Sequence, residues 1–338
     1  MKMAMFDTHV YDRASFDLAN QQFGHAITYL EPRLTALTAK LAAGFPVACA
    51  FVNDRADAET LGILAAGGTR LLALRSAGHN HVDLRVAAEL GIAVVRVPAY
   101  SPYAVAEHAV ALVLALNRKI HRASARVREW NFSLEGLVGF DLHGKTVGII
   151  GAGKIGQVAA RIFKGFGCTV LCYDPYPDQQ FALDVGAHYV ELTELFSQSH
   201  IISLHAPLTP DTYHLINTDA LSQMRPKAML INTSRGALVD SRALVRALKS
   251  GNLGSAGLDV YEEEAGIFFQ DLSNEVLQDD ILARLLSFPN VLITSHQAFM
   301  TTEALRNIAE VTLENVRTYE QGRPLENAVV AEAVGRGS

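Results

Sequence analysis

Cysteine, charge and long apolar runs are scarce in this sequence of 338 residues, and each scarcity excludes a class of protein. The three cysteines, Cys49, Cys168 and Cys172, are too few and too irregularly spaced for a disulfide framework. Cys168 and Cys172 flank a short apolar run, which predicts core residues rather than redox centres or metal ligands. We therefore expect no metal site.

The charge balance and the apolar runs also limit what the chain binds. No stretch of about 18 apolar residues occurs, and the opening MKMAMFDTHVYD is polar and acidic where a signal peptide needs an apolar stretch. Charged residues make up 19% of the chain and the net charge is -6, which disfavours unspecific attraction to nucleic acid or anionic lipid. A cytoplasmic protein that binds neither nucleic acid nor membrane is expected.

Short β-branched runs alternate with helical patterns along the chain, which predicts βαβ units and parallel sheets. The first third contains runs at 2–6, 47–52, 70–74 and 92–97, with a helical pattern at 57–66. A second series has six runs, at 146–150, 169–174, 200–205, 228–232, 255–260 and 291–294, with a helical pattern at 241–250. The last helical stretch, 302–322, lies beyond this series and is expected to return to the first domain.

One long helical pattern begins after Pro102 and runs to about residue 129, with proline near its start, where a helix tolerates it. We interpret it as the boundary between two domains. Its end carries five basic residues, which form either a polyanion-binding patch or, as the acidic composition favours, a solvated or interdomain helix face. These residues are Arg118, Lys119, Arg122, Arg126 and Arg128.

A glycine fingerprint follows the predicted strand at 146–150. Gly151, Gly153 and Gly156 match G-x-G-x-x-G between a strand and a helix, where the backbone can approach a pyrophosphate at the helix N-terminus. The next strand ends in Asp174, roughly 20 residues on, where a carboxylate can bind the adenosine ribose or, alternatively, serve as a turn residue before Pro175. Because Asp174 would repel the extra phosphate of NADP, NAD is the expected cofactor.

Six motifs carry a resemblance to a known family. The chain resembles the D-isomer-specific 2-hydroxyacid dehydrogenases, most closely the fermentative D-lactate dehydrogenases among them, over nearly its whole length. The motifs are LRSAGHNHVDL from Leu74, VRVPAYSPYAVAEHAV from Val95, GKTVGIIGAGKIG from Gly144, INTSRGALVD from Ile231, GLDVYEEE from Gly257 and TSHQAF from Thr294.

The resemblance implies two doubly wound α/β domains with parallel sheets. Residues 1–100 and 299–338 would form a discontinuous, flavodoxin-like substrate-binding domain, and residues 101–298 a Rossmann domain that binds NAD. It also implies reversible hydride transfer between NADH and pyruvate to give D-lactate, in a homodimer or homotetramer.

The catalytic residues are implied by their positions in the family motifs. Reduction of a 2-keto acid needs a cation for the carboxylate and a proton donor for the developing alkoxide. Arg235 corresponds to the arginine that binds the carboxylate, and its planar fork suits two oxygens. His296 corresponds to the acid–base histidine, and Glu264 to the carboxylate that orients it. Glu262 and Glu263 adjoin Glu264, so its assignment rests on the spacing from Asp259.

Further contacts are also implied by the resemblance. The substrate residues would be Arg75, Ala77, Gly78, Tyr100 and Phe299. Tyr100 would supply a hydroxyl near the substrate, and Phe299 would limit the substrate side chain to little more than a methyl group. The cofactor residues would include Lys154, Ile155, Ala206, Pro207, Thr212, Thr233, Ser234 and Asp259, with a loop-capping role as the alternative for Asp259. A broader enzyme acting on phenylpyruvate or branched 2-keto acids, and an NAD-sensing transcriptional corepressor, are the alternative functions.

Overall fold

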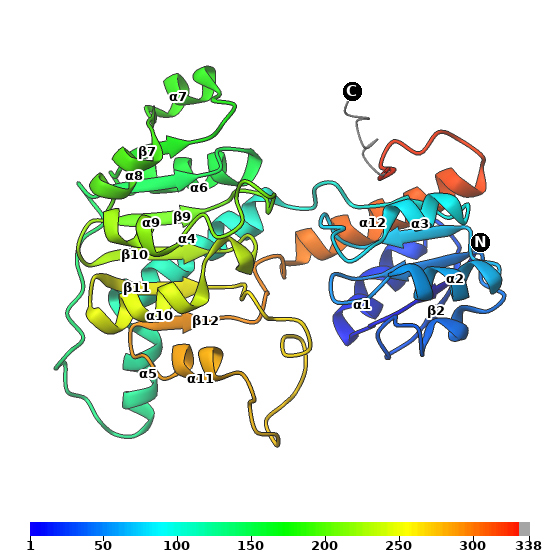
Figure 1. Cartoon of the computed structure of the whole chain (residues 1–338), viewed down its shortest axis with the longest axis horizontal. Helices are drawn as coiled ribbons and strands as arrows, with labels where there is room; N and C mark the ends of the chain where they lie inside the picture. The colour runs from blue at the N-terminus through cyan, green and yellow to red at the C-terminus, as the bar shows by residue number, and fades with distance from the viewer. Residues whose placement is uncertain (331–338) are drawn as a thin grey trace. The chain divides into compact units, whose positions relative to one another are not determined.

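The computed structural model describes residues 1–330, and the chain divides into two compact units. The first unit comprises Met1–Ser101 together with the residues from Met300 onward, and the second comprises Pro102–Phe299. Each unit contains its own parallel sheet. The two units are described separately below, with the element labels of Figure 1.

The sheet of the first unit has five parallel strands in the order β2-β1-β3-β4-β5, which is the flavodoxin-like arrangement. Its strands are β1 (Lys2–Met5), β2 (Ala26–Tyr29), β3 (Val47–Ala50), β4 (Leu71–Leu74) and β5 (Ala93–Val95). The helices are α1 (Val10–Asn20), η1 (Ala39–Ala42), α2 (Ala58–Ala66), α3 (Leu84–Glu89) and α12 (Thr302–Glu320). Helix α12 packs against α1 and belongs to the first unit.

The sheet of the second unit has seven parallel strands in the Rossmann order β12-β11-β10-β9-β6-β7-β8. The strands are β6 (Thr146–Ile150), β7 (Thr169–Tyr173), β8 (His188–Tyr189), β9 (Ile201–Leu204), β10 (Ala228–Asn232), β11 (Leu253–Leu258) and β12 (Val291–Ile293). The helices are α4 (Pro102–Arg118), α5 (Ile120–Arg128), α6 (Lys154–Gly165), α7 (Gln179–Val185), α8 (Leu192–Gln198), α9 (Thr218–Gln223), η2 (Gly236–Leu238), α10 (Ser241–Ser250) and α11 (Asp280–Leu286).

Two apolar layers cover the faces of the seven-stranded sheet. Consecutive strand residues point to opposite faces, so Ile149 packs with α4 and α6, whereas Ile150 packs with the layer of α8 to α11. This burial on both faces explains why strands β6 and β10 read as continuous apolar runs. Cys168 and Cys172 are buried in the core, as predicted, and Cys49 is buried as well.

The sequence reading missed two strands. β2 is the edge strand of the smaller sheet, and its residues alternate between exposed and half-buried. β8 is a two-residue strand at an edge of the larger sheet. Edge strands carry less apolar surface than central ones, so their composition resembles that of loops. The second series therefore has seven strands rather than the expected six.

The long helix expected from Pro102 to about residue 129 is a second correction. It is broken at Lys119, whose φ of 50° lies in the left-handed region, and it continues as α5. The side chain of Asn117 donates to Phe140 O at 2.7 Å and accepts from Phe140 N at 2.8 Å. The end of α4 therefore coincides with contacts to the distant loop at Phe140, and not with a helix-breaking residue in the local sequence. Within residues 1–330, no helix has both the length and the apolarity needed to cross a bilayer.

Candidate active site

The predicted cofactor and catalytic residues of the second unit lie on the loops that follow β6, β7, β9, β10, β11 and β12. Because all strands of this sheet are parallel, these loops share its carboxyl edge. The strand order reverses direction between β9 and β6, and ligands of doubly wound folds bind at such a switch point.

The glycine turn after β6 is closely packed on one side and open on the other. A Cβ on Gly151, whose φ is 91°, would lie 2.5 Å from Ala206 N, and one on Gly156 would lie 2.0 Å from Gly151 O. A Cβ on Gly153 would meet nothing within 4 Å. Gly153 is the N-cap of α6, whose first residues are Lys154 and Ile155, so the open position lies at a helix N-terminus suited to an anion.

Asp174 follows β7 and lies beside this turn. Its Oδ2 accepts a hydrogen bond from Ala152 N at 2.8 Å, and its Oδ1 accepts one from Tyr176 N at 2.9 Å. Asp174 is therefore a turn residue. The same bonds also fix a carboxylate next to the glycine turn, where the ribose acceptor of a dinucleotide site is expected.

The loops after β9 and β10 are tied together. Ser234 Oγ donates to Leu204 O at 3.0 Å, and Thr212 Oγ1 donates to Pro207 O at 2.7 Å. Thr233 is buried, and its Oγ1 has no hydrogen-bond partner in the part of the chain that the structure describes. An open helix N-terminus, a nearby carboxylate and an unsatisfied hydroxyl on adjacent loops fit a dinucleotide.

Arg235 lies half-buried directly after β10. Its carbonyl accepts a hydrogen bond from Asn232 Nδ2 at 2.8 Å, and its Nη1 donates to Ser234 O at 2.7 Å. The next residue, Gly236, packs so closely that a Cβ there would lie 2.0 Å from Tyr261 C. Arg235 is therefore held against the segment after β11 that carries the acidic run.

His296 and Glu264 form an ion pair on the loops after β12 and β11. His296 Nδ1 donates to Glu264 Oε1 at 2.8 Å, and Glu264 Oε2 accepts from Tyr261 N at 3.0 Å. The side chains are 17% and 20% exposed, respectively, so both are sheltered but remain accessible. Because Glu264 fixes Nδ1, Nε2 is the nitrogen left to exchange a proton.

The structure distinguishes Glu264 from its acidic neighbours. Glu262 accepts from His214 Nε2 at 2.5 Å and from Ser241 N at 3.2 Å, whereas Glu263 is exposed. The acidic run thus contains two separate imidazole–carboxylate pairs. His214 was not identified from the sequence, because its partner lies 48 residues away.

Asp259, which is fully buried, holds the loop that carries His296. Its two oxygens accept from Thr294 Oγ1 at 2.5 Å, Gln297 N at 2.9 Å and Ala298 N at 2.9 Å. Burial raises the pKa of Asp259, but its hydrogen bonds, that with His108 foremost, outweigh this and hold the pKa below its usual value. The loop-capping alternative thus describes its contacts, and its place beside nicotinamide stays a prediction.

His108 on α4 is a second histidine that sequence reasoning missed. Its Nε2 lies 3.1 Å from Thr294 Oγ1 and 3.3 Å from Asp259 Oδ1. The only signal in the sequence is a histidine within an otherwise apolar helix. Such a residue is more often a core histidine, and its contact with Thr294 spans 186 residues.

In the first unit, the loop after β4 contains Ala77 and Gly78, both half-buried. Their carbonyls accept hydrogen bonds from Arg96 Nη1 at 3.0 Å and Ser76 Oγ at 2.8 Å. Across residues 1–330, the backbone N–H groups of these two residues donate to no other group of the chain. They are therefore available to a ligand.

The contacts of Arg75, whose substrate role stays a prediction, lie within the first unit. Its backbone N–H donates to Ala50 O at 3.0 Å, and its side chain is 1% exposed, with Nε 3.3 Å from Asp12 Oδ1 and Nη2 2.5 Å from Asp7 O. The backbone N–H and the guanidinium of Arg75 therefore both bond to groups of the first unit, where the guanidinium compensates buried carboxylates. Tyr100 is half-buried, with its carbonyl bonded to Asn307, and Phe299 is buried in the second unit.

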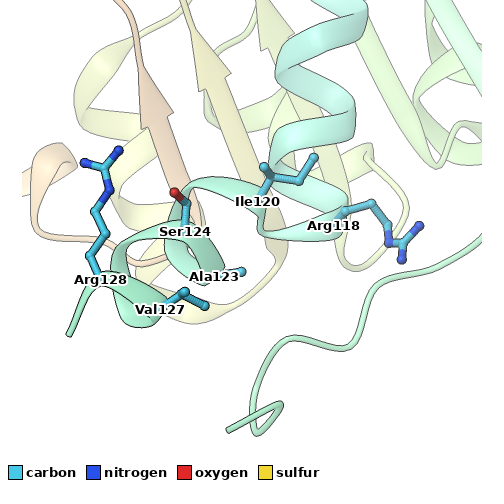
Figure 2. A pocket seen from close by; sticks show the side chains of 6 residues that line it. All are labelled: Arg118, Ile120, Ala123, Ser124, Val127 and Arg128. Carbon is cyan, nitrogen blue, oxygen red and sulfur yellow. The ribbon is translucent and has the colours of Figure 1, made fainter. Parts of the chain in front are cut away.

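A separate pocket of about 660 Å³ lies on α5 and the end of α4 and contains none of the predicted site residues (Figure 2). Its lining residues are Arg118, Ile120, Ala123, Ser124, Val127 and Arg128. Helix α5 has no fully buried residue; among its basic residues Arg128 is exposed, whereas Arg122 and Arg126 are half-buried.

Comparison with known proteins agrees with this geometry. Residues 110–298 match the sequence model of the D-isomer specific 2-hydroxyacid dehydrogenase NAD binding domain. D-lactate dehydrogenase of Escherichia coli is 51% identical over 330 residues, 98% of this chain and 100% of that protein. The chain belongs to the D-isomer specific 2-hydroxyacid dehydrogenase family.

Solved structures of family members extend the comparison to the whole fold. A structure described as the pyruvate reductase of Chlamydomonas reinhardtii superposes with a TM-score of 0.92 at 47% identity, covering 97% of this chain and 98% of that one. D-lactate dehydrogenase of Lactobacillus jensenii, solved with NAD+, superposes with a TM-score of 0.82 at 30% identity, covering 98% and 100%. This dehydrogenase therefore uses NAD, as the sequence predicted.

Proposed function

We propose that the chain catalyses reversible hydride transfer between NADH and pyruvate to give D-lactate. The ion pair of His296 with Glu264 is the observation that carries this proposal, because it provides an oriented acid–base group at the edge where the cofactor residues gather. The printed names of the similar proteins, D-lactate dehydrogenase and pyruvate reductase, support the choice of substrate.

Arg235 binds the substrate carboxylate in this proposal. A guanidinium offers parallel N–H donors that match two oxygens, and the bond from Asn232 keeps the Arg235 backbone in place. Binding a planar keto acid through its carboxylate also orients the carbonyl carbon. NADH, when bound, supplies the hydride.

During reduction, His296 donates its proton to the carbonyl oxygen of the substrate. During oxidation, it accepts the proton of the substrate hydroxyl group. Nδ1 stays bonded to Glu264, so the proton that moves is the one on Nε2. The Glu264 carboxylate accepts the Nδ1 hydrogen bond and so fixes the orientation of the imidazole ring. The Tyr261 N–H keeps Glu264 itself in place.

Several finer assignments stay predictions from the sequence. These are the substrate-binding role of the first unit, the carboxylate contacts of Ala77 and Gly78, the hydroxyl contact of Tyr100 and the restriction of substrate size by Phe299. A cytoplasmic location and a homodimer or homotetramer are likewise predictions. The side chains of Trp130, Phe132 and Leu134, which follow α5, are strongly exposed.

The decisive experiment is an NADH oxidation assay with pyruvate, 2-ketobutyrate, phenylpyruvate and hydroxypyruvate, with analysis of product chirality. We expect fast turnover of pyruvate to D-lactate. A preference for phenylpyruvate would overturn the size restriction but leave the catalytic residues in place. NADH binding without turnover of any keto acid would overturn the enzymatic proposal in favour of a binding role.

A further inference from the structure

We propose that His108 is a positioning residue for His296, acting through Asp259 and Thr294. The inference rests on the acid–base role proposed for His296. It concerns a side chain on α4, far from the catalytic residues in sequence, that touches the groups holding the catalytic loop.

The backbone at His296 needs to be held in place. Its φ of 50° lies in the left-handed region, which residues with a Cβ rarely adopt. His296 N donates to Asp259 O at 2.7 Å, and the following two N–H groups donate to the Asp259 carboxylate. Asp259 therefore secures the turn before and after the imidazole.

Asp259 can accept these bonds together only while it is ionised. A protonated carboxyl would direct an O–H toward groups that are themselves donors, namely the Thr294 hydroxyl and two backbone N–H groups. Because the side chain is fully buried, ionisation needs a compensating donor.

His108 supplies that donor from α4. Thr294 Oγ1 already donates its proton to Asp259 Oδ1, so the hydrogen between His108 and these two acceptors must be on His108 Nε2. Among residues 1–330, His108 is the ionisable side chain paired with Asp259, and the loop contributes only a hydroxyl and backbone N–H groups. Loss of His108 would leave Asp259 easier to protonate and Thr294 less constrained.

The test compares His108→Leu, which removes the donor, with His108→Gln, which keeps an N–H on a side chain of similar reach. His200→Gln is the matched control, since His200 is also half-buried in this unit but bonds Thr146 N at the opposite edge of the sheet. Pyruvate turnover, NADH affinity and the pH profile are measured for each variant.

We expect His108→Leu to lower kcat about 10–100-fold, the scale of a slightly misplaced catalytic group, with NADH affinity within about twofold of wild type. His108→Gln should recover most of the lost kcat. The remaining activity of His108→Leu should fall on acidification at a higher pH than in wild type, because Asp259 is then protonated more readily. Unchanged kcat in His108→Leu, or equal damage in both variants, would overturn the proposal.

A second readout does not depend on turnover. In protein labelled with ¹⁵N-histidine, the side-chain signal of His296 is identified by its loss in His296→Ala. It should move in His108→Leu, return in His108→Gln and stay in place in His200→Gln. If His108→Leu does not fold, Thr294→Val removes the same link and should move the signal. An unmoved signal overturns the positioning role, whereas a moved signal in a protein without keto-acid turnover overturns only the proposed function.

Discussion

The two units carry polar clusters at equivalent edges of their parallel sheets, but they use them differently. In the first unit, Arg75 after β4 faces Asp12 and lies 4.7 Å above the Phe51 ring, with 1% of its surface exposed. In the second unit, His296 and Glu264 are paired but remain partly accessible. The first cluster holds loops together within the unit, whereas the second stays partly open to solvent, as the catalytic role proposed for it requires.

This difference teaches that a charged residue after a buried strand is not by itself a binding residue. Asp54 in the first unit accepts hydrogen bonds from Leu34 N and Phe51 N, both at 2.6 Å, and so joins two loops. Asp259 in the second unit does the same for one loop, but that loop carries His296. Mutations in the first cluster should therefore change stability, and those in the second should change activity.

The largest effect is expected from His296→Ala. Removal of the acid–base group should lower turnover of pyruvate by two or more orders of magnitude while NADH binding is kept, in line with typical contributions of roughly 10²–10⁴-fold. Steady-state kinetics and fluorescence titration with NADH check this. His214→Ala, which removes the imidazole paired with Glu262, is the matched control and should stay within a fewfold of wild type. Turnover of His296→Ala close to that of the control would contradict the assignment.

The next largest effect is on the stability of the first unit. Arg75→Met leaves Asp12 buried without its cationic partner, which should lower the free energy of unfolding by about 3–5 kcal/mol. Thermal and urea unfolding monitored by circular dichroism measure the change. Arg85→Met is the control, because the exposed pair of Arg85 with Glu89 contributes roughly 0.5 kcal/mol or less. Equal stability of the two variants would mean that the buried pair of Arg75 with Asp12 contributes no more to the free energy of unfolding than the exposed pair of Arg85 with Glu89.

A smaller change is expected for Glu264→Gln. Replacement of one acceptor oxygen by an amide group weakens the bond that holds Nδ1, so the imidazole of His296 is oriented less firmly. The rate of pyruvate reduction should drop about tenfold. Steady-state kinetics test this, with Glu262→Gln as the control, because Glu262 pairs with His214. A drop in Glu262→Gln but not in Glu264→Gln would show that Glu264 is not the orienting carboxylate.

The smallest effect concerns Asp54 and the pH dependence of stability. Burial raises the pKa of Asp54 to about 7, above its value in the unfolded chain. The folded state therefore retains a proton that the unfolded state loses, so this contribution is present below about pH 4 and is lost as pH rises to about 7. The stability of wild type should fall relative to that of Asp54→Asn as the pH rises through this window. Parallel pH curves for the two proteins would contradict it.

The sequence by itself determined the features that depend on neighbouring residues. The runs at 146–150 and 228–232 and the helix at 241–250 were predicted with the bounds that the structure has, because burial on both faces and helical periodicity leave a local pattern. The glycine turn was readable for the same reason, since steric requirements at Gly151 and Gly156 act within a short βα unit. The family motifs then identified the family and its cofactor.

Only the tertiary structure decided which polar side chains meet. It paired Glu264 rather than Glu262 with His296, turned Arg75 inward, ended α4 at Lys119 and brought His108 to Asp259. Each of these outcomes depends on contacts between residues far apart in the chain. Local propensity cannot report them, because the energy of a buried charge is set by the partners that folding places around it.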